Sequence, residues 1–153
     1  MNLEHDVIII TGASSGIGKA TAIKLAENGA KVVLMARSED DLIDLKSKIE
    51  ANGGEALVVT GDVTKKDDFK NVVSKAKAEY GKLTGLINNA GLMPLSFVEK
   101  LKTDEWEKMV DVNIKGVLNG VAAVLPELKV NNGGNIVNIS SMAANRYFPG
   151  GAV

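Results

Sequence analysis

The sequence predicts an α/β protein with a doubly wound parallel sheet of five strands and flanking helices. Short runs of apolar and β-branched residues alternate with longer amphipathic segments, which is typical of βα units. The first apolar run, 7–10, leads into the glycine-rich segment 11–18 and then into a helix-like stretch. No internal repeat, low-complexity tract or linker interrupts this pattern, so we expect residues 1–153 to form a single domain.

The alternation gives the expected elements in order along the chain. Runs rich in Val, Ile, Leu and Thr predict strands, and the intervening segments, with apolar residues at helical spacing, predict helices. The expected strands are 6–11, 31–36, 55–60, 85–88 and 135–140. The expected helices are 16–28, 39–52, 65–80 and 104–129.

Local signals mark where these helices begin and end. Ser38 and Thr64 are predicted N-caps, each followed three residues later by an aspartate, as in a capping box. Glycines after residues 28, 52 and 80 are expected to close three helices, and Pro126 is expected to kink or end the fourth. The side chains expected in the core by their helical spacing are Leu25, Leu42, Leu45, Ile49, Phe69, Val72, Val73, Trp106, Met109, Val110 and Leu118.

The composition excludes several classes of protein. A formal net charge of -1 without a basic stripe argues against nucleic acid as a partner. We find no apolar stretch long enough to cross a bilayer and no signal-peptide layout, so we expect no membrane partner and a cytoplasmic location. Without cysteine and with a single histidine, His5, the sequence has too few parts for a disulfide, a thiolate or histidine metal site, or a Ser-His-Asp triad.

The glycine loop is suited to binding a phosphate group. Glycines at 12, 16 and 18 let the backbone turn tightly, and the start of the following helix favours an anion. The spacing is Gly-x-x-x-Gly-x-Gly, not the commoner dinucleotide pattern, and Ala20 after Gly18-Lys19 excludes a Walker loop. On its own, the loop could also be a tight turn that binds no ligand.

Arg37 favours NADP over NAD as the ligand. It follows the second expected strand, roughly 20 residues beyond the glycine loop, where dinucleotide-binding chains carry a ribose-recognising group. Ala36 offers no carboxylate for a 2'-hydroxyl, whereas the Arg37 guanidinium suits a 2'-phosphate. The alternative is that Arg37 is a solvated charge at a strand end.

Polar residues follow the other strands as well. Asp62 comes after the third, Asn89 after the fourth and Ser141 after the fifth, while Asn113 lies on the long helix. Each position could be an ordinary turn, because Asp, Asn and Gly favour bends. Together they predict a site, since the carboxyl ends of parallel strands meet at one edge of a sheet.

The chain resembles the short-chain dehydrogenase/reductase family, in particular its NADP-preferring members. Motifs in the family's order cover essentially all of the chain: 11–18 (Thr-Gly-Ala-Ser-Ser-Gly-Ile-Gly), Asp62-Val63, Asn88-Asn89-Ala90-Gly91, Asn113 with Gly116, and 136–141 (Ile-Val-Asn-Ile-Ser-Ser). The resemblance implies a Rossmann-type sheet that binds a nicotinamide dinucleotide, NADP(H) rather than NAD(H). It also implies hydride transfer between the nicotinamide and a small-molecule carbonyl or alcohol.

The resemblance assigns roles to particular residues. Those implied to bind the cofactor are, from diphosphate through 2'-phosphate and adenine to nicotinamide, Gly12, Ser14, Ser15, Ile17, Gly18, Arg37, Asp62, Val63, Asn89, Ala90 and Gly91. Ser141, or Ser140 if the register differs by one, is implied to polarise the substrate oxygen, and Asn113 to hold a water in a proton relay. The segments 92–95 and 145–151 are expected to border the substrate pocket.

The family's Tyr-x-x-x-Lys motif is missing from this sequence. Neither Tyr80 nor Tyr147 has a lysine four residues later. We therefore expect a C-terminally incomplete domain that holds the cofactor but is inactive as it stands, with its fifth strand as an exposed apolar edge. The complete protein is expected to be a homo-oligomer. The alternatives are a non-catalytic dinucleotide-binding module and an interaction protein that reuses the fold without a cofactor.

Overall fold

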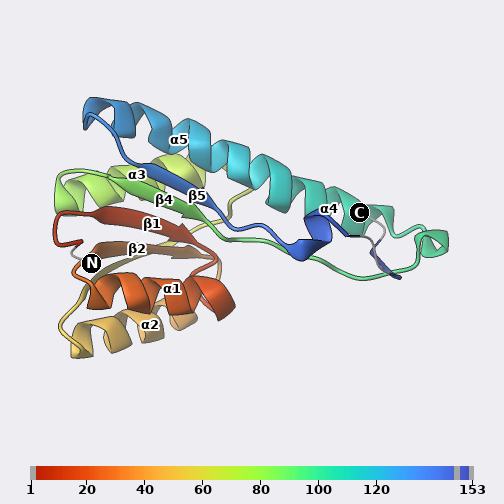
Figure 1. Cartoon of the computed structure of the whole chain (residues 1–153), viewed down its shortest axis with the longest axis horizontal. Helices are drawn as coiled ribbons and strands as arrows, with labels where there is room; N and C mark the ends of the chain where they lie inside the picture. The colour runs from red at the N-terminus through yellow and green to blue at the C-terminus, as the bar shows by residue number, and fades with distance from the viewer. Residues whose placement is uncertain (1–2, 147–148, 152–153) are drawn as a thin grey trace.

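The computed structural model describes residues 3–146 and 149–151 and contains a parallel sheet (Figure 1). Its strands are β1 Val7–Thr11, β2 Lys31–Ala36, β3 Glu55–Thr60, β4 Gly85–Asn88 and β5 Asn135–Asn138. They lie in the order β3-β2-β1-β4-β5, and every neighbouring pair is parallel. Strands β2 and β3 therefore lie on one side of β1, and β4 and β5 lie on its other side, so the strand order reverses between β1 and β4.

Helices connect the strands. Their bounds are α1 Gly16–Glu27, α2 Glu39–Ala51, α3 Lys66–Tyr80, α4 Thr103–Val110 and α5 Gly116–Val130. A π-helical segment, η2 Asp111–Lys115, joins α4 to α5, and short 3-10 helices lie at η1 Val98–Lys100 and η3 Met142–Ala144. We call the stretch from Thr103 to Val130 the long helix.

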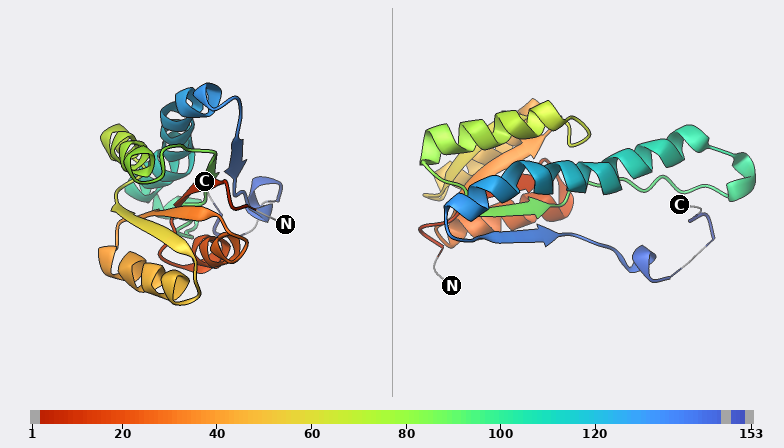
Figure 2. Two further views of the ribbon diagram at one scale, coloured as in Figure 1. Left: turned by 90° about the vertical axis from the view of Figure 1, so that its left-hand side faces the viewer. Right: turned by 90° about the horizontal axis from the view of Figure 1, so that it is seen from above.

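The sheet is doubly wound, with helices on both faces (Figure 2). Successive β2 residues point to opposite faces, because side chains alternate along a strand. Val33 and Met35 join a core with α3 and α5, whereas Val32 and Leu34 join a second core with α1 and α2. The central strands are thus buried on both faces, which explains their continuous apolar runs.

The predicted elements agree with the structure within one or two residues, and one predicted N-cap is wrong. The N-cap of α3 is Lys65, not Thr64, because the Thr64 hydroxyl donates to Asp62 Oδ1 instead, at 2.9 Å. Ser38 is the N-cap of α2, but its side chain makes no capping bond. Pro126 does not end its helix, which runs on to Val130. The carbonyl left without a partner, that of Ala122, belongs to an exposed residue, where water can bond it.

Two residues predicted for the core are exposed. Val110 and Leu118 lie on the outer face of the long helix, Leu118 with 62% of its surface accessible. Leu25 and Trp106 are partly buried, and the other predicted core residues are buried. Helical spacing identifies an apolar face but does not show whether another element covers it. Within the described chain, the outer face of the long helix stays uncovered.

The long helix also contradicts the expectation that no segment is long enough to cross a membrane. Its 28 residues, Thr103–Val130, are long enough and, by mean hydropathy, apolar enough to cross a membrane. In the structure, the inner face of α5 packs on the sheet through Gly116, Gly120, Val124 and Leu128. Packing on the sheet accounts for the apolar character of that face.

The end of β5 is exposed in the described part of the chain. Val137 and Ile139 are 46% and 41% accessible, and within the described residues β5 pairs with β4 alone. The predicted strand 135–140 ends at Asn138 in the structure, although Ile139 N still donates to Asn88 O at 2.9 Å. The expected apolar edge is therefore present.

Candidate functional site

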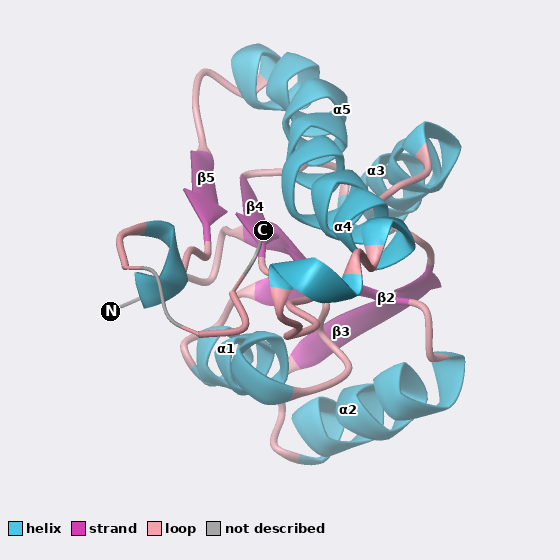
Figure 3. Ribbon diagram, turned by 90° about the vertical axis from the view of Figure 1, so that its right-hand side faces the viewer, coloured by secondary structure: helices cyan, strands magenta, loops and turns pink. Residues whose placement is uncertain are grey.

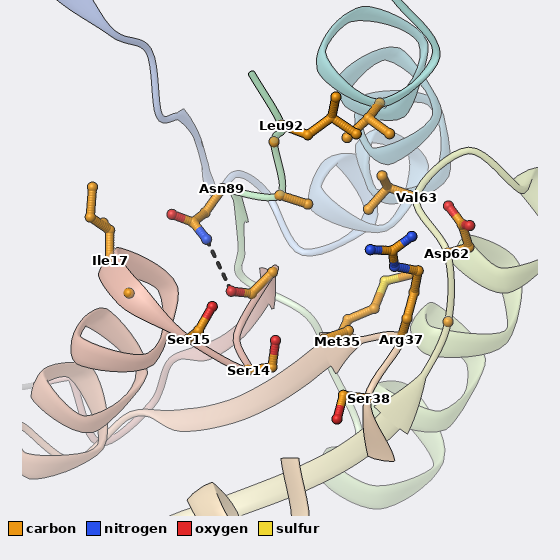
Figure 4. A pocket seen from close by; sticks show the side chains of 17 residues that line it. Ser14, Ser15, Ile17, Met35, Arg37, Ser38, Asp62, Val63, Asn89 and Leu92 are labelled. Atoms are coloured by element: carbon orange, nitrogen blue, oxygen red, sulfur yellow. Dashed lines mark hydrogen bonds between the residues drawn. The ribbon is translucent and has the colours of Figure 1, made fainter. Parts of the chain in front are cut away.

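A pocket of about 600 Å³ lies at the carboxyl ends of the strands, which face the viewer in Figure 3. It spans the point between β1 and β4 where the strand order reverses, the usual ligand site of an open parallel sheet. The residues that line it, many of them labelled in Figure 4, are Gly12, Ser14, Ser15, Gly16, Ile17, Met35, Ala36, Arg37, Ser38, Gly61, Asp62, Val63, Asn89, Ala90, Gly91, Leu92 and Val112.

Glycine is needed at each of the three positions of the loop for a different structural reason. Gly12 has φ +64°, and a Cβ on it would lie 2.9 Å from Ala90 Cα. Gly18 packs still more closely, with Gly12 O and Asn89 Nδ2 each 2.4 Å from the position of a Cβ. Gly16 has φ +53° and lines the pocket with no atom within 4 Å of that position. Gly12 and Gly18 therefore let backbones approach, whereas Gly16 leaves open space before the loop.

The start of α1 offers unpaired donors beside the pocket. Ser15 is the N-cap but makes no side-chain capping bond, and the first turn holds no acidic residue. The bond from Lys19 N to Ser15 O, at 3.2 Å, closes the first turn, so the amides of residues 16–18 lack helical partners. These N–H groups and the positive end of the helix dipole favour a bound anion.

Thr11 and Asn89 fasten the glycine loop to the end of β4. The Thr11 hydroxyl, in a residue only 1% accessible, accepts hydrogen bonds from Asn89 N and Ala90 N, both at 3.0 Å. In return, Asn89 Nδ2 donates to Thr11 O at 2.9 Å and to Gly12 O at 3.2 Å, the latter drawn in Figure 4. Sequence reasoning gave Thr11 no role of its own, although it is the first residue of the loop motif.

Arg37 and Asp62 lie side by side at one end of the pocket (Figure 4). Partial burial raises the pKa of the Asp62 carboxyl. Hydrogen bonds from Thr64 N and Oγ1, followed by the positive charges of Arg37 and Lys65, outweigh this effect, so the pKa lies below its ordinary value. Among the described residues Arg37 forms no salt bridge, which leaves its exposed guanidinium free for an anionic ligand.

Asn113 lies in the π segment and is bonded to a pocket residue. Its Oδ1 accepts from Leu92 N at 2.9 Å, and its Nδ2 donates to Leu92 O at 2.8 Å. Asn113 itself does not line the pocket. Of the eleven residues implied to bind the cofactor, Gly18 does not line it either, and the other ten do: Gly12, Ser14, Ser15, Ile17, Arg37, Asp62, Val63, Asn89, Ala90 and Gly91.

Ser141 lies outside the pocket lining, at the start of η3. It is exposed, and its Oγ accepts from Ala143 N at 3.1 Å. The strand before it is held by Asn88, whose Nδ2 donates to Asn138 Oδ1 at 2.9 Å. Of the segments expected to border the substrate, 145–151 is bonded to the residue that directly follows 92–95: Ser96 N donates to Gly150 O at 2.8 Å. Tyr147 and Phe148 lie outside the described residues.

The described residues contain no group of three or more His, Cys, Asp or Glu side chains that could hold a metal ion. The polar groups in the pocket are instead backbone amides, hydroxyls, one amide side chain, one guanidinium and one carboxylate. Such a set suits an organic ligand with phosphate groups better than a bare cation.

The strand order and the glycine loop at the switch point define a Rossmann-type α/β protein. The short chain dehydrogenase family model matches residues 6–153. The chain therefore belongs to the short-chain dehydrogenase family, a family of oxidoreductases.

Individual relatives agree with this assignment. An uncharacterized oxidoreductase from Listeria monocytogenes is 54% identical over 153 residues, all of this chain and 62% of the relative. A crystal structure of a short-chain type dehydrogenase/reductase from Mycobacterium marinum superposes with a TM-score of 0.92 at 30% identity, over 96% of this chain and 60% of that one.

An alcohol dehydrogenase from the archaeon Thermococcus sibiricus, solved in complex with 5-hydroxy-NADP, has a TM-score of 0.89 at 33% identity, over 95% of this chain and 62% of that one. The chain thus spans about three fifths of the length of these relatives.

Proposed function

We propose that this chain binds NADP(H) and forms the cofactor-binding part of an oxidoreductase that transfers hydride between the nicotinamide and a small carbonyl or alcohol substrate. The observation that carries the proposal is the pocket in which the glycine loop, Arg37, Asp62 and Asn89 come together. These residues come from four different βα loops, and a bare turn would not require them to converge.

The pocket fits a dinucleotide in both shape and chemistry. The open space at Gly16 and the unpaired amides of residues 16–18 suit a diphosphate. Arg37 suits the 2'-phosphate of NADP, and Ala36 supplies no carboxylate to repel it. One carboxylate oxygen of Asp62 is bonded by Thr64, and its other oxygen is available to accept from an adenine amine.

The chain's own residues would hold and orient both reactants. Bound NADP(H) supplies the hydride chemistry. Ser141 would donate a hydrogen bond to the substrate oxygen, and Asn113 would hold a water for proton relay. The Asn113 side chain already bonds Leu92, so that water would bond its backbone. No Tyr-x-x-x-Lys sequence occurs among the 153 residues, and we propose that these residues bind the cofactor without turnover.

A second candidate is a dinucleotide-binding module without catalysis, because a fold alone does not establish an activity. The homo-oligomer remains a proposal, supported by the exposed apolar residues Val110, Ile114, Leu118 and Leu125 along the long helix. A cytoplasmic location and the absence of nucleic-acid and membrane partners also stay predictions.

Isothermal titration with NADPH and NADH tests the cofactor assignment. Arg37→Asp should weaken NADPH binding by roughly 10- to 100-fold, the size expected for a charge-assisted phosphate contact, and change NADH binding little. Arg146→Asp is the matched control, because Arg146 is the other arginine of the sequence and lies outside the pocket. Equal losses for both nucleotides in Arg37→Asp, or no binding by the folded wild type, would contradict the proposal.

A further inference from the structure

Asn119 on α5 is bonded to the loop that forms the Asp62 side of the pocket. Its Nδ2 donates to Val63 O at 3.0 Å, across 56 residues of sequence. One turn earlier, Gly116 lies directly under the Val63 side chain, since a Cβ at Gly116 would be 2.9 Å from Val63 Cγ2. Asn119 does not line the pocket, so it acts on any ligand through Val63 and its neighbour Asp62.

Gly61 N, at the start of this loop, donates to Ala36 O at the end of β2 at 2.9 Å, and the loop's other hydrogen bonds come from nearby residues. Asp62 N donates to Asp68 Oδ2 at 2.8 Å, and Lys65 N donates to Asp62 O at 2.9 Å. Thr64 donates twice to Asp62 Oδ1. These bonds define the turn itself. Among the described residues, the bond from Asn119 is the side-chain hydrogen bond that joins this turn to the second half of the chain, beside the packing of Val63 on α5.

The long helix also fixes a second loop of the pocket, the one after β4. Asn113, six residues before Asn119 in the sequence, holds Leu92 through two hydrogen bonds from its side chain to the Leu92 backbone. Leu92 and Val63 lie on the side of the pocket that faces the long helix (Figure 4). Two asparagines of one helix thus hold the loops after β3 and β4 at a set separation.

We propose that Asn119 is a positioning residue for the adenine side of the pocket. This inference rests on the proposed function. The Val63 carbonyl belongs to a residue only 9% accessible, so losing its donor leaves a polar group that regains a partner only if the loop moves toward water. That movement displaces Asp62. It therefore weakens the binding of the adenine half of the nucleotide, which Asp62 and Arg37 would contact together.

Titration of the purified protein with adenosine 2',5'-bisphosphate, which carries only the adenine half of NADP, provides the test. Asn119→Leu keeps the number and branching of the side-chain heavy atoms, favours a helix and removes the donor. We expect it to weaken binding by roughly 3- to 10-fold, the range of a single net hydrogen bond. Amide hydrogen exchange in 61–65 should become faster in the same variant. Asn119→Ala serves as a second variant.

Asn131→Leu is the matched control, because Asn131 Nδ2 donates to Leu83 O at 2.9 Å from the far end of α5. It should leave bisphosphate affinity and exchange in 61–65 unchanged. Wild-type affinity in both Asn119 variants, or equal losses in Asn119→Leu and Asn131→Leu, would overturn the role of Asn119 and leave the proposed function intact. If the folded wild type bound neither the bisphosphate nor NADPH, the proposed function and this inference would fall together.

Discussion

Replacing Gly18 with alanine is expected to destabilise the protein, although alanine is the better helix former. Gly18 lies in the first turn of α1, where the gain in helix propensity is at most about 1 kcal/mol. Against this, the new Cβ would lie 2.4 Å from Gly12 O and 2.4 Å from Asn89 Nδ2. Ordinary contacts begin at 3.4 Å, so each neighbour has to move by about 1 Å.

Neither neighbour can move freely. Gly12 O is a backbone atom of the loop, and Asn89 Nδ2 is bonded to Thr11 O at 2.9 Å and to Gly12 O at 3.2 Å. Overpacking costs about 1 to 3 kcal/mol, and each stretched hydrogen bond costs about 1 kcal/mol more. After subtraction of the propensity gain, we expect the free energy of unfolding to fall by about 2 to 4 kcal/mol.

Urea denaturation followed by circular dichroism measures this change. Gly53→Ala is the matched control: Gly53 has φ +80°, lies after α2, and has no atom within 4 Å of the position that a Cβ would take. It tests backbone strain alone, for which we expect a loss of about 1 kcal/mol. A Gly18→Ala protein as stable as the wild type, or no less stable than Gly53→Ala, would refute the close-approach reasoning.

Two further predictions concern the same edge of the sheet. Thr11→Val is isosteric but leaves the amides of Asn89 and Ala90 without their acceptor. The free energy of unfolding, measured in urea, should therefore fall by about 2 to 4 kcal/mol. Thr11→Ser keeps the hydroxyl and should lose less stability. The pKa of Asp62 is lower in the folded protein than its ordinary value of 3.8. Its ionised form therefore stabilises the fold above pH 3.8, and this contribution disappears as the pH falls through the pKa of the folded protein. Asp62→Asn should therefore show a shallower loss of stability below about pH 4 than the wild type, and parallel pH profiles would show that the carboxylate makes no such contribution.

Much of the fold could be predicted from the sequence because the strands of a doubly wound sheet are buried on both faces. Runs such as 32–36 have to be continuously apolar, and the glycines that close the helices have to permit left-handed backbone, as Gly81 does with φ +76°. Thr64 failed as an N-cap because its hydroxyl had a competing acceptor in Asp62, two residues earlier. Local capping rules do not weigh such competition.

The sequence could predict which residues gather at this edge of the sheet, but not the hydrogen bonds that hold them there. Arg37 and Asp62 follow strands, and parallel strands end at one edge, so their proximity follows from the topology. The bonds of Thr11 to the end of β4 and of Asn119 to Val63 join residues far apart in sequence. The local sequence around an asparagine or threonine does not show whether its side chain bonds to a distant residue or to water.

The hydrogen bonds between Thr11 and the end of β4 have a consequence for the order of events during synthesis. The residues they join are separated by 78 and 79 positions, so the bonds cannot form until β4 has been made and has docked beside β1. A nascent chain that has emerged only as far as β3 already carries every glycine of the loop, yet the Thr11 hydroxyl has none of these partners. Loop closure over that distance is slow compared with the formation of α1. A ribosome-bound series of increasing length should therefore acquire nucleotide affinity abruptly after Ala90 emerges, not gradually with α1.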